Sequence, residues 1–454
     1  MTSFIAKPRE LFDRFDPKYV AFKRRAANFR YPAVKMGSLL SEPPEYGAGE
    51  AGIERVDEQT PRYIRITDID ENGELLPGLG MTAANVESQY FLRDGDLLFA
   101  RSGNTVGKSY LYESERVPYP CFYAGYMIRF RFGEKVLPKY VFAFAQTPYY
   151  HEWVSAIQRS AGQPNINAQE YRTLEIPLPP LPEQRKIVAE LDAAYAAKRA
   201  ADEKATKLLS SIDDMVLNEL GIAKLPKPGT SLSSRIFTVP AREATNGRLD
   251  AYYYRSSFKD LTKKLSCCNC VPFGRLITEI YNGIDCRDYK ESGVPYLKVA
   301  NVKPGEFDFD DLKYIDPQEL GAKDIALRAG RMLLTRKGTF GNAIALSENY
   351  DYAISSEVFC LSIKNELVDV HYLETFVNSS IGRMLCDKYK IGAIMGSLSQ
   401  EAVKALPIPL PDAKVQHRIA SRASSIRAEA RKLRADAIAA LDAAKRKIEM
   451  QVMK

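Results

Sequence analysis

The segment that decides the fold reads IPLPPLPEQRKI, at residues 176–187, and a long stretch with helical periodicity follows it. A weaker copy, LPIPLPDAKVQHRI, stands at residues 406–419 before a second such stretch. The copies lie about 230 residues apart, half the chain, and a period of that size indicates two tandem copies of one large unit rather than a solenoid of small repeats. Two similar units on one chain suit a target with two similar halves.

The duplication extends upstream of the proline-rich segments. YIRITDI at 63–69 matches YLKVANV at 296–302, and both alternate in polarity as half-buried strands do. LRDGDLLFARSG at 92–103 matches LRAGRMLLTRKG at 327–338, and in each a glycine turn leads into an apolar strand that ends in Arg-x-Gly. Each copy then continues into a helical stretch and a second glycine loop, at 138–158 with GQPN (162–165) and at 367–388 with GSLS (396–399).

Composition limits the class of protein. With 454 residues and 45% hydrophobic content, two to four packed domains are expected. The apolar runs are far shorter than a membrane span, and the first residues lack the layout of a secretion signal. Seven cysteines whose spacings do not match across the repeat indicate a reduced, cytoplasmic chain. A net charge of +7 permits nucleic acid or acidic partners and selects neither.

Two uninterrupted helices are expected after the proline-rich segments. Residues 183–220 contain no glycine or proline, and Gly221 stands where a C-cap glycine belongs. From Ile419 to Ala444 the second helix carries apolar residues at steps of four and three, a heptad seam. A helix of about 35 residues spans roughly 50 Å, so antiparallel pairing is favoured over each helix merely covering its own domain. Ten Lys/Arg against four acids from Arg418 onward fit either a phosphate or acidic partner or a solvated face.

Motifs for catalysis or cofactors are not evident. SGNTVGKS at 102–109 resembles a phosphate-binding loop, but Ser102 replaces its first glycine and the second copy lacks the lysine. CCNC at 267–270 has no second CxxC or HxxxH, so free thiols are favoured over zinc. We find no glycine-rich methyl-donor loop and no Asn/Asp-Pro-Pro-aromatic segment. We therefore expect no catalytic centre, no metal and no cofactor.

The proline-rich segments, the two Arg-x-Gly turns and the twofold repeat together resemble the specificity subunit of a type I restriction–modification system. The resemblance implies an α+β chain: two similar globular α/β target recognition domains separated by two long antiparallel coiled-coil helices. The domains would be residues 1–182 and 222–411, and the spacer helices residues 183–221 and 412–454. The second copy departs from the pattern because residues 412–415 precede Gln416 and no glutamate stands before it, which would weaken one partner contact.

The resemblance also implies partners. Such a subunit binds double-stranded DNA, docks two methyltransferase subunits, is joined in some systems by nuclease/translocase subunits, and does no chemistry itself; a membrane partner is not expected. The helices set the gap between the half-sites and carry the docking surface. Their candidate residues are Ile187, Leu191, Leu208, Ile212, Ile419, Ile426 and Leu433.

Base identity is read at groove edges by arginine to guanine, asparagine or glutamine to adenine, and serine or threonine to either. The glycine loops carry such residues: Arg101, Asn104, Lys108, Gln163, Asn165 and Asn167 in the first copy, and Arg336, Lys337, Thr339 and Ser397 in the second. Arg65 and Lys298 occupy equivalent basic positions that also suit phosphate. For each residue the alternative is an ordinary surface turn.

Two rival functions stay open from sequence. One is a structural adaptor whose two arms hold proteins and read no DNA. The other is a DNA reader in a different phage-defence methylation complex that lacks a classical nuclease.

Overall fold

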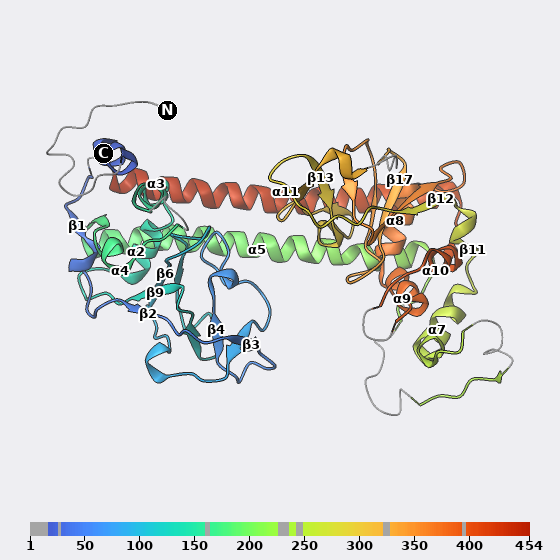
Figure 1. Ribbon diagram of the computed structural model, residues 1–454, viewed down its shortest axis with the longest axis horizontal. Coiled ribbons are helices and arrows are strands. Elements are labelled where there is room, and N and C mark those ends of the chain that lie inside the picture. The colour runs from blue at the N-terminus through green and yellow to red at the C-terminus, as the bar shows by residue number, and fades with distance from the viewer. Residues whose placement is uncertain are drawn as a thin grey trace. The chain divides into compact units, whose positions relative to one another are not determined.

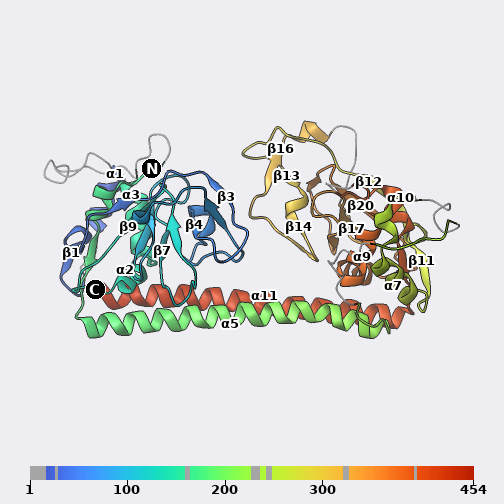
Figure 2. The same cartoon turned by 90° about the horizontal axis from the view of Figure 1, so that it is seen from below.

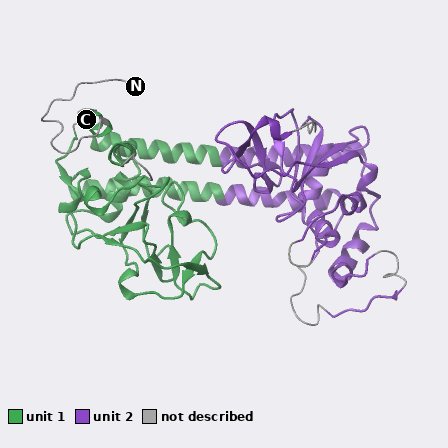
Figure 3. Cartoon of the chain, viewed as in Figure 1, with its two compact units in different colours: residues 1–202, 434–454 green, residues 203–433 purple. Residues whose placement is uncertain are grey.

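The computed structural model describes residues 17–25, 29–158, 164–225, 236–241, 248–320, 327–392 and 396–454 (Figure 1). The chain forms two compact units: unit 1 is Met1–Asp202 with Arg434–Lys454, and unit 2 is Glu203–Leu433 (Figure 3). The two long helices, α5 (Leu181–Glu219) and α11 (Ala413–Val452), each have residues in both units. Among the described residues, no helix combines the length and apolar character that crossing a membrane requires.

Unit 1 combines antiparallel and mixed sheets with short helices. Its strands are β1 (Ala33–Lys35), β2 (Glu45–Tyr46), β3 (Gly52–Glu54), β4 (Arg62–Ile64), β5 (Met81–Ala83), β6 (Leu97–Ala100), β7 (Ser109–Leu111), β8 (Cys121–Tyr123), β9 (Met127–Phe130) and β10 (Glu175–Pro177), and its short helices are α1 (Pro17–Arg25), α2 (Pro138–Phe144), α3 (Pro148–Ile157) and α4 (Ala168–Arg172). One sheet has the order β2-β9-β6-β7 and is antiparallel, and a second has the order β3-β5-β4-β8 with a parallel pair, β4 and β8. The proline-rich segment supplies β10, which pairs with β1.

Unit 2 repeats this topology. Its strands are β11 (Cys270–Pro272), β12 (Ile277–Asn282), β13 (Val294–Leu297), β14 (Val302–Lys303), β15 (Glu306–Phe307), β16 (Lys313–Ile315), β17 (Arg331–Thr335), β18 (Ala343–Ala345), β19 (Ala353–Ile354), β20 (Val358–Ile363) and β21 (Pro407–Pro409), and its short helices are α7 (Ser256–Leu265), α8 (Val370–Asn378), α9 (Ser380–Tyr389) and α10 (Gln400–Ala405). The order β12-β20-β17-β18 reproduces β2-β9-β6-β7, and the parallel pair β13 and β19 reproduces β4 and β8. The predicted α+β class is confirmed.

The two segments predicted as strands at 63–69 and 296–302 are not continuous strands, although Val302 begins β14. After Ile64 and after Leu297 the chain turns into a short 3-10 helix, at Ile66–Asp68 and Val299–Asn301. The cause is the Asp/Asn position of the repeat. Asp68 accepts a hydrogen bond from the backbone N–H of Arg65 (3.0 Å). Asn301 accepts the equivalent bond from Lys298 (2.9 Å). Such a side-chain acceptor competes with continuation of a strand.

The helical stretches predicted at 138–158 and 367–388 are each broken into two helices. The breaks lie at Thr147 and Ser379, whose side-chain oxygens cap the following helix by accepting from Tyr150 and Gly382. An N-cap residue adopts an extended backbone, so a helix cannot run through it. The pairs α2–α3 and α8–α9 result.

Segments of α5 and α11 lie side by side within each unit, and they run antiparallel (Figure 2). In unit 1, Glu190 pairs with Lys447 (2.9 Å) near one end and Asp202 pairs with Arg434 (3.9 Å) further along. In unit 2, Glu219 accepts hydrogen bonds from Arg418. The predicted antiparallel pairing is confirmed. Since Ala440 is exposed, one detail of the seam is wrong: the buried positions shift to Leu441, Lys445, Ile448 and Val452. Because an α-helix has 3.6 residues per turn, positions spaced by a strict seven-residue repeat gradually rotate away from the neighbouring helix. Successive steps of four residues bring the buried positions back toward that helix.

The glutamine of each proline-rich segment is a buried internal tie. Gln184, fully buried, accepts from the Leu137 N–H at the start of α2 (2.9 Å) and donates to the Pro179 carbonyl (2.9 Å). Gln416 makes the same two bonds, accepting from the Asp369 N–H (2.9 Å) and donating to the Pro411 carbonyl (2.8 Å). The altered spacing of the second copy therefore leaves the tie intact. The glutamate present only in the first copy, Glu183, is exposed and pairs with Lys186.

A glycine turn of each unit contacts side chains of the long helices. In unit 1, Asn72 accepts from Lys445 of α11 (2.7 Å) through its side chain and from the Tyr195 hydroxyl of α5 through its carbonyl. In unit 2 the equivalent turn places Gly305, with φ +76°, against the ion pair of Arg427 (α11) and Glu374 (2.8 Å). Burial raises the pKa of Glu374, and Arg427 opposes that rise.

Candidate nucleic-acid interface

In each unit the structure brings the two glycine loops together. Ser102 forms a β-bridge with Asn165, and the Arg101 carbonyl accepts from the Ile166 N–H (2.9 Å). In unit 2, Lys337 forms the corresponding bridge with Ser397, and the Arg336 carbonyl accepts from the Leu398 N–H (2.8 Å). Segments about 60 residues apart in sequence therefore form one surface, and most of the candidate DNA-contacting residues lie on it.

An arginine stands at the centre of each loop pair. The Arg101 guanidinium lies 4.9 Å from the Tyr46 ring centroid, and that of Arg336 lies 5.1 Å from the Phe359 ring centroid. Within the described part of the chain, the buried Nε of each arginine has no hydrogen-bond partner. A ring face holds the cation in place while leaving donors of the guanidinium for a ligand.

Arg65 and Lys298 occupy equivalent places, each beginning one of the 3-10 turns. Arg65 forms an ion pair with Asp68 (3.0 Å) and retains 38% of its side-chain exposure. Lys298 pairs with Asp311 (3.3 Å). Asp311 is 65% exposed, and exposed pairs of this kind are weak, so Lys298 can exchange its acid for a phosphate. Asp68 is buried, and Arg65 is bound to it more firmly, through its guanidinium as well as its backbone N–H.

Other candidates are committed to the fold. Lys108 pairs with Glu71 (2.6 Å) and donates to the Ile69 carbonyl (3.2 Å). Asn167 caps α4 by accepting from the Glu170 N–H (2.9 Å). The phosphate-loop alternative also fails locally, because strand β7, rather than a helix, follows Lys108.

The remaining candidates differ in exposure. Asn104, Lys337 and Thr339 are exposed at the loop tips. Asn165 and Ser397 are half-buried. Gln163 lies outside the described residues.

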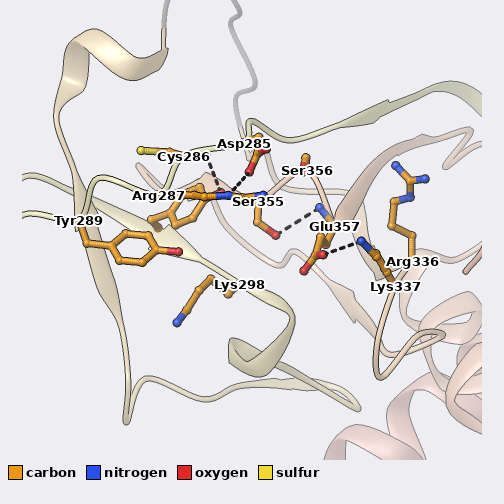
Figure 4. Close-up of a pocket in the computed structure, with 11 residues that line it drawn as sticks. Asp285, Cys286, Arg287, Tyr289, Lys298, Arg336, Lys337, Ser355, Ser356 and Glu357 are labelled. Carbon is orange, nitrogen blue, oxygen red and sulfur yellow. Dashed lines mark hydrogen bonds and ion pairs between the residues drawn. The ribbon is translucent and has the colours of Figure 1, made fainter. Parts of the chain in front are cut away.

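Unit 2 carries a cavity of about 330 Å³ at this loop pair (Figure 4). It contains three predicted residues, Lys298, Arg336 and Lys337, and eight that the sequence reasoning missed: Asp285, Cys286, Arg287, Tyr289, Tyr296, Ser355, Ser356 and Glu357. Four cations against two carboxylates make its lining basic on balance. Lys337 lies 3.5 Å from Glu357, and Arg287 lies 3.8 Å from Asp285.

Tyr296 lies in β13, and the other missed residues come from the segment after β12 and the segment before β20. The one sequence signal that links them is the duplicated tyrosine. Tyr63 donates its hydroxyl proton to the Ala48 carbonyl (2.8 Å), and Tyr296 donates to the Ile284 carbonyl (2.8 Å). Burial raises the pKa of Tyr296 to about 12, which keeps the hydroxyl a donor. The residues around Ala48 and Ile284 differ too much for the repeat to be seen there from sequence.

The residues proposed to dock partners are divided between core and rim. Ile187, Leu191 and Ile419 are buried, at 4%, 1% and 0% exposure, in the core of their own unit. Leu208, Ile212, Ile426 and Leu433 are half-buried. On α11, two large apolar side chains, Ile438 and Met450, are exposed, at 49% and 66%. A docked partner would contact the half-buried and exposed side chains, because the buried ones pack inside their own unit.

Among the described residues, no cluster of three or more His, Cys, Asp or Glu side chains has the arrangement of a metal site. The seven cysteines are free thiols, including Cys267, Cys268 and Cys270.

Known proteins resemble the chain as follows. The family described as "Type I restriction modification DNA specificity domain" matches residues 63–207 and 285–440. The chain is 23% identical over 349 residues to the type I restriction enzyme EcoKI specificity subunit of Escherichia coli K12, covering 73% of this chain and 67% of that subunit. It is 22% identical over 288 residues to the EcoBI specificity subunit of Escherichia coli, covering 61% and 58%. A solved HsdS subunit from Thermoanaerobacter tengcongensis aligns over 93% of this chain and 96% of its own, at 16% identity and a TM-score of 0.34.

Proposed function

The chain belongs to the type I restriction modification DNA specificity family, and from this premise we propose that it reads a two-part site on double-stranded DNA, one half with each unit. The observation that carries the proposal is the duplicated loop pair, in which Arg101 and Arg336 each hold a guanidinium group against an aromatic ring. The family match does not favour an adaptor that reads no DNA.

The proposed contacts follow from the local geometry. Arg101 and Arg336 are assigned to guanine edges, which arginine reads through two acceptors in the major groove. Asn104, Thr339, Asn165 and Ser397 flank them at the same surface. Arg65, whose own side chain is 38% exposed, and Lys298, whose acidic partner is exposed, are assigned to phosphates. Lys108 and Asn167 support the loops from within.

In the proposed complex the partner subunits supply the catalytic activity, and this chain supplies none. Two methyltransferase subunits would dock on α5 and α11, nuclease/translocase subunits are further candidate partners, and the site of action is the cytoplasm. The target recognition domains would comprise residues 1–182 and 222–411, with spacer helices at 183–221 and 412–454. Basic side chains of α11 that face solvent, such as Arg431 and Lys432, suit an acidic partner surface.

Selection from a random double-stranded DNA library, with the full chain and its methyltransferase partner, tests the proposal. We expect enrichment of two short blocks separated by a fixed gap. Replacing residues 1–175 with those of another family member should change one block and leave the second block unaltered. Enrichment of no motif, or a change in both blocks, would refute the two-reader scheme.

A further inference from the structure

Tyr126 of unit 1 and Glu357 of unit 2 occupy the same place in the fold. Each stands immediately before the strand that pairs with β6 or β17, namely β9 and β20. The backbone carbonyl of each accepts a hydrogen bond from the backbone N–H of the central arginine of its own unit. The Arg101 N–H donates to the Tyr126 carbonyl (2.9 Å), and the Arg336 N–H donates to the Glu357 carbonyl (2.9 Å). The backbone position is therefore shared, and the side chains differ completely.

Both side chains are exposed, and each belongs to a residue hydrogen-bonded to the backbone of the central arginine. Tyr126 is 66% exposed, which is unusual for a large aromatic residue of a packed unit. The Glu357 side chain is 47% exposed at the cavity, where it faces Lys337 (Figure 4). Their ion pair is long and open to solvent, so water or a ligand competes with it easily. In unit 1 Ser102 stands in place of Lys337, so neither charge of this ion pair is present there.

A carboxylate at the centre of a basic surface has a specific consequence for a nucleic-acid ligand. It repels phosphates, so it lowers the affinity for every sequence that does not offer it a hydrogen-bond donor. In the major groove, the exocyclic amino group of cytosine is a donor that Glu or Asp accepts. Lys337 faces this carboxylate, with its Nζ 3.5 Å from the carboxylate oxygen. A tyrosine at the same point offers a ring and a hydroxyl, and it imposes no such requirement.

Resting on the proposed function, we infer that the position occupied by Tyr126 and Glu357 determines which base pair each unit accepts beside its arginine. Glu357 requires a cytosine amino group in the half-site of unit 2, and Lys337 positions its carboxylate. Tyr126 sets a different preference in the half-site of unit 1. One substitution on a duplicated scaffold thus lets two similar readers recognise unlike half-sites.

Random-site selection with the full chain and its methyltransferase partner tests this inference through Glu357→Gln and Tyr126→Glu. The near-isosteric glutamine removes the charge, and it should reduce the preference for G·C over other pairs at one position of one half-site by about tenfold or more. Tyr126→Glu should create a new preference at one position of the other half-site. Glu366→Gln, which removes an exposed carboxylate of unit 2 outside the cavity, is the matched control and should change nothing.

The outcomes separate the two claims. If the wild-type chain enriches no motif, the proposed function fails, and this inference fails with it. If the wild-type chain enriches a two-part motif and both variants enrich the same motif unchanged, the inference alone is refuted. If Glu357→Gln alters both half-sites, the residue does not act within one reader, and the inference is equally refuted. Melting curves of both variants beside wild type confirm that the compared chains are folded.

Discussion

Substituting Gln184 by alanine should destabilise unit 1 strongly, although Gln184 lies in the segment most readily interpreted as a partner motif. Its amide is fully buried and accepts from the Leu137 N–H while donating to the Pro179 and Lys135 carbonyls, at 2.9, 2.9 and 3.3 Å. Each buried group left without a partner costs about 1–3 kcal/mol. With two well-formed bonds lost, the free energy of unfolding should fall by roughly 2–4 kcal/mol.

Glu183→Ala supplies the contrast from the adjacent residue. Its ion pair with Lys186 is solvent-exposed, with side-chain exposures of 41% and 69%, so its loss should change stability by no more than about 0.5 kcal/mol. Gln416→Ala should match Gln184→Ala in unit 2, because it removes the equivalent bonds to Asp369 and Pro411.

Urea unfolding combined with amide hydrogen exchange measures these effects in each unit. Gln184→Ala should speed exchange at the Leu137 amide, and Gln416→Ala at the Asp369 amide. If Glu183→Ala proved as damaging as Gln184→Ala, or if Gln184→Ala left both the midpoint and the Leu137 amide unchanged, the glutamine would not be an internal tie. A partner-docking role would instead leave the isolated chain unaffected and lower only the affinity for the methyltransferase.

Three further predictions concern the turns and the buried ionisable groups. Arg427→Met should lower the free energy of unfolding by about 3–5 kcal/mol at pH 7, because it leaves Glu374 buried and charged. Burial raises the Glu374 pKa, so this loss should shrink as pH falls, and it should largely vanish in the double variant Arg427→Met/Glu374→Leu. Equal stability of the single and double variants in urea unfolding would contradict this prediction. Gly305→Ala would place a Cβ 2.5 Å from Arg427 and Glu374 at φ +76°, whereas the Cβ of Gly338→Ala, at φ +69°, meets nothing within 4 Å. In thermal unfolding, Gly338→Ala should therefore lower stability by only about 1–2 kcal/mol, and Gly305→Ala should lower it by more. A larger loss of stability for Gly338→Ala would contradict this packing. Burial raises the pKa values of Tyr140, Tyr195 and Tyr372, so the unfolded chain ionises these residues first, and the stabilisation present below pH 10 should be lost above it. Tyrosinate absorbance that reaches the value for all 26 tyrosines before the chain unfolds would contradict this.

The duplication and the long helices were readable from sequence because they depend on local pattern. Proline rhythm, Arg-x-Gly turns and helical periodicity are written along the chain, and neighbouring residues decide them. Local pattern also misled where a side chain competes with the backbone. Asp68 and Asn301 end their strands early, and Thr147 divides one predicted helix into two. In the second long helix the buried position is Leu441 and not the predicted Ala440, because the face that is buried depends on the surface of the neighbouring helix.

The candidate surface was predictable in part. Arg101 and Arg336 were identified because they end a duplicated strand in a glycine turn, a local feature. Glu357, Arg287 and Tyr289 were missed because they reach the cavity from segments that are distant in sequence and poorly repeated. Sequence by itself determined that two like units with long helices exist, since periodicity and turn chemistry act over a few residues. Only the tertiary structure decided which polar side chains come into contact, because these contacts depend on strand pairing between segments that are distant in sequence and share no recognisable pattern.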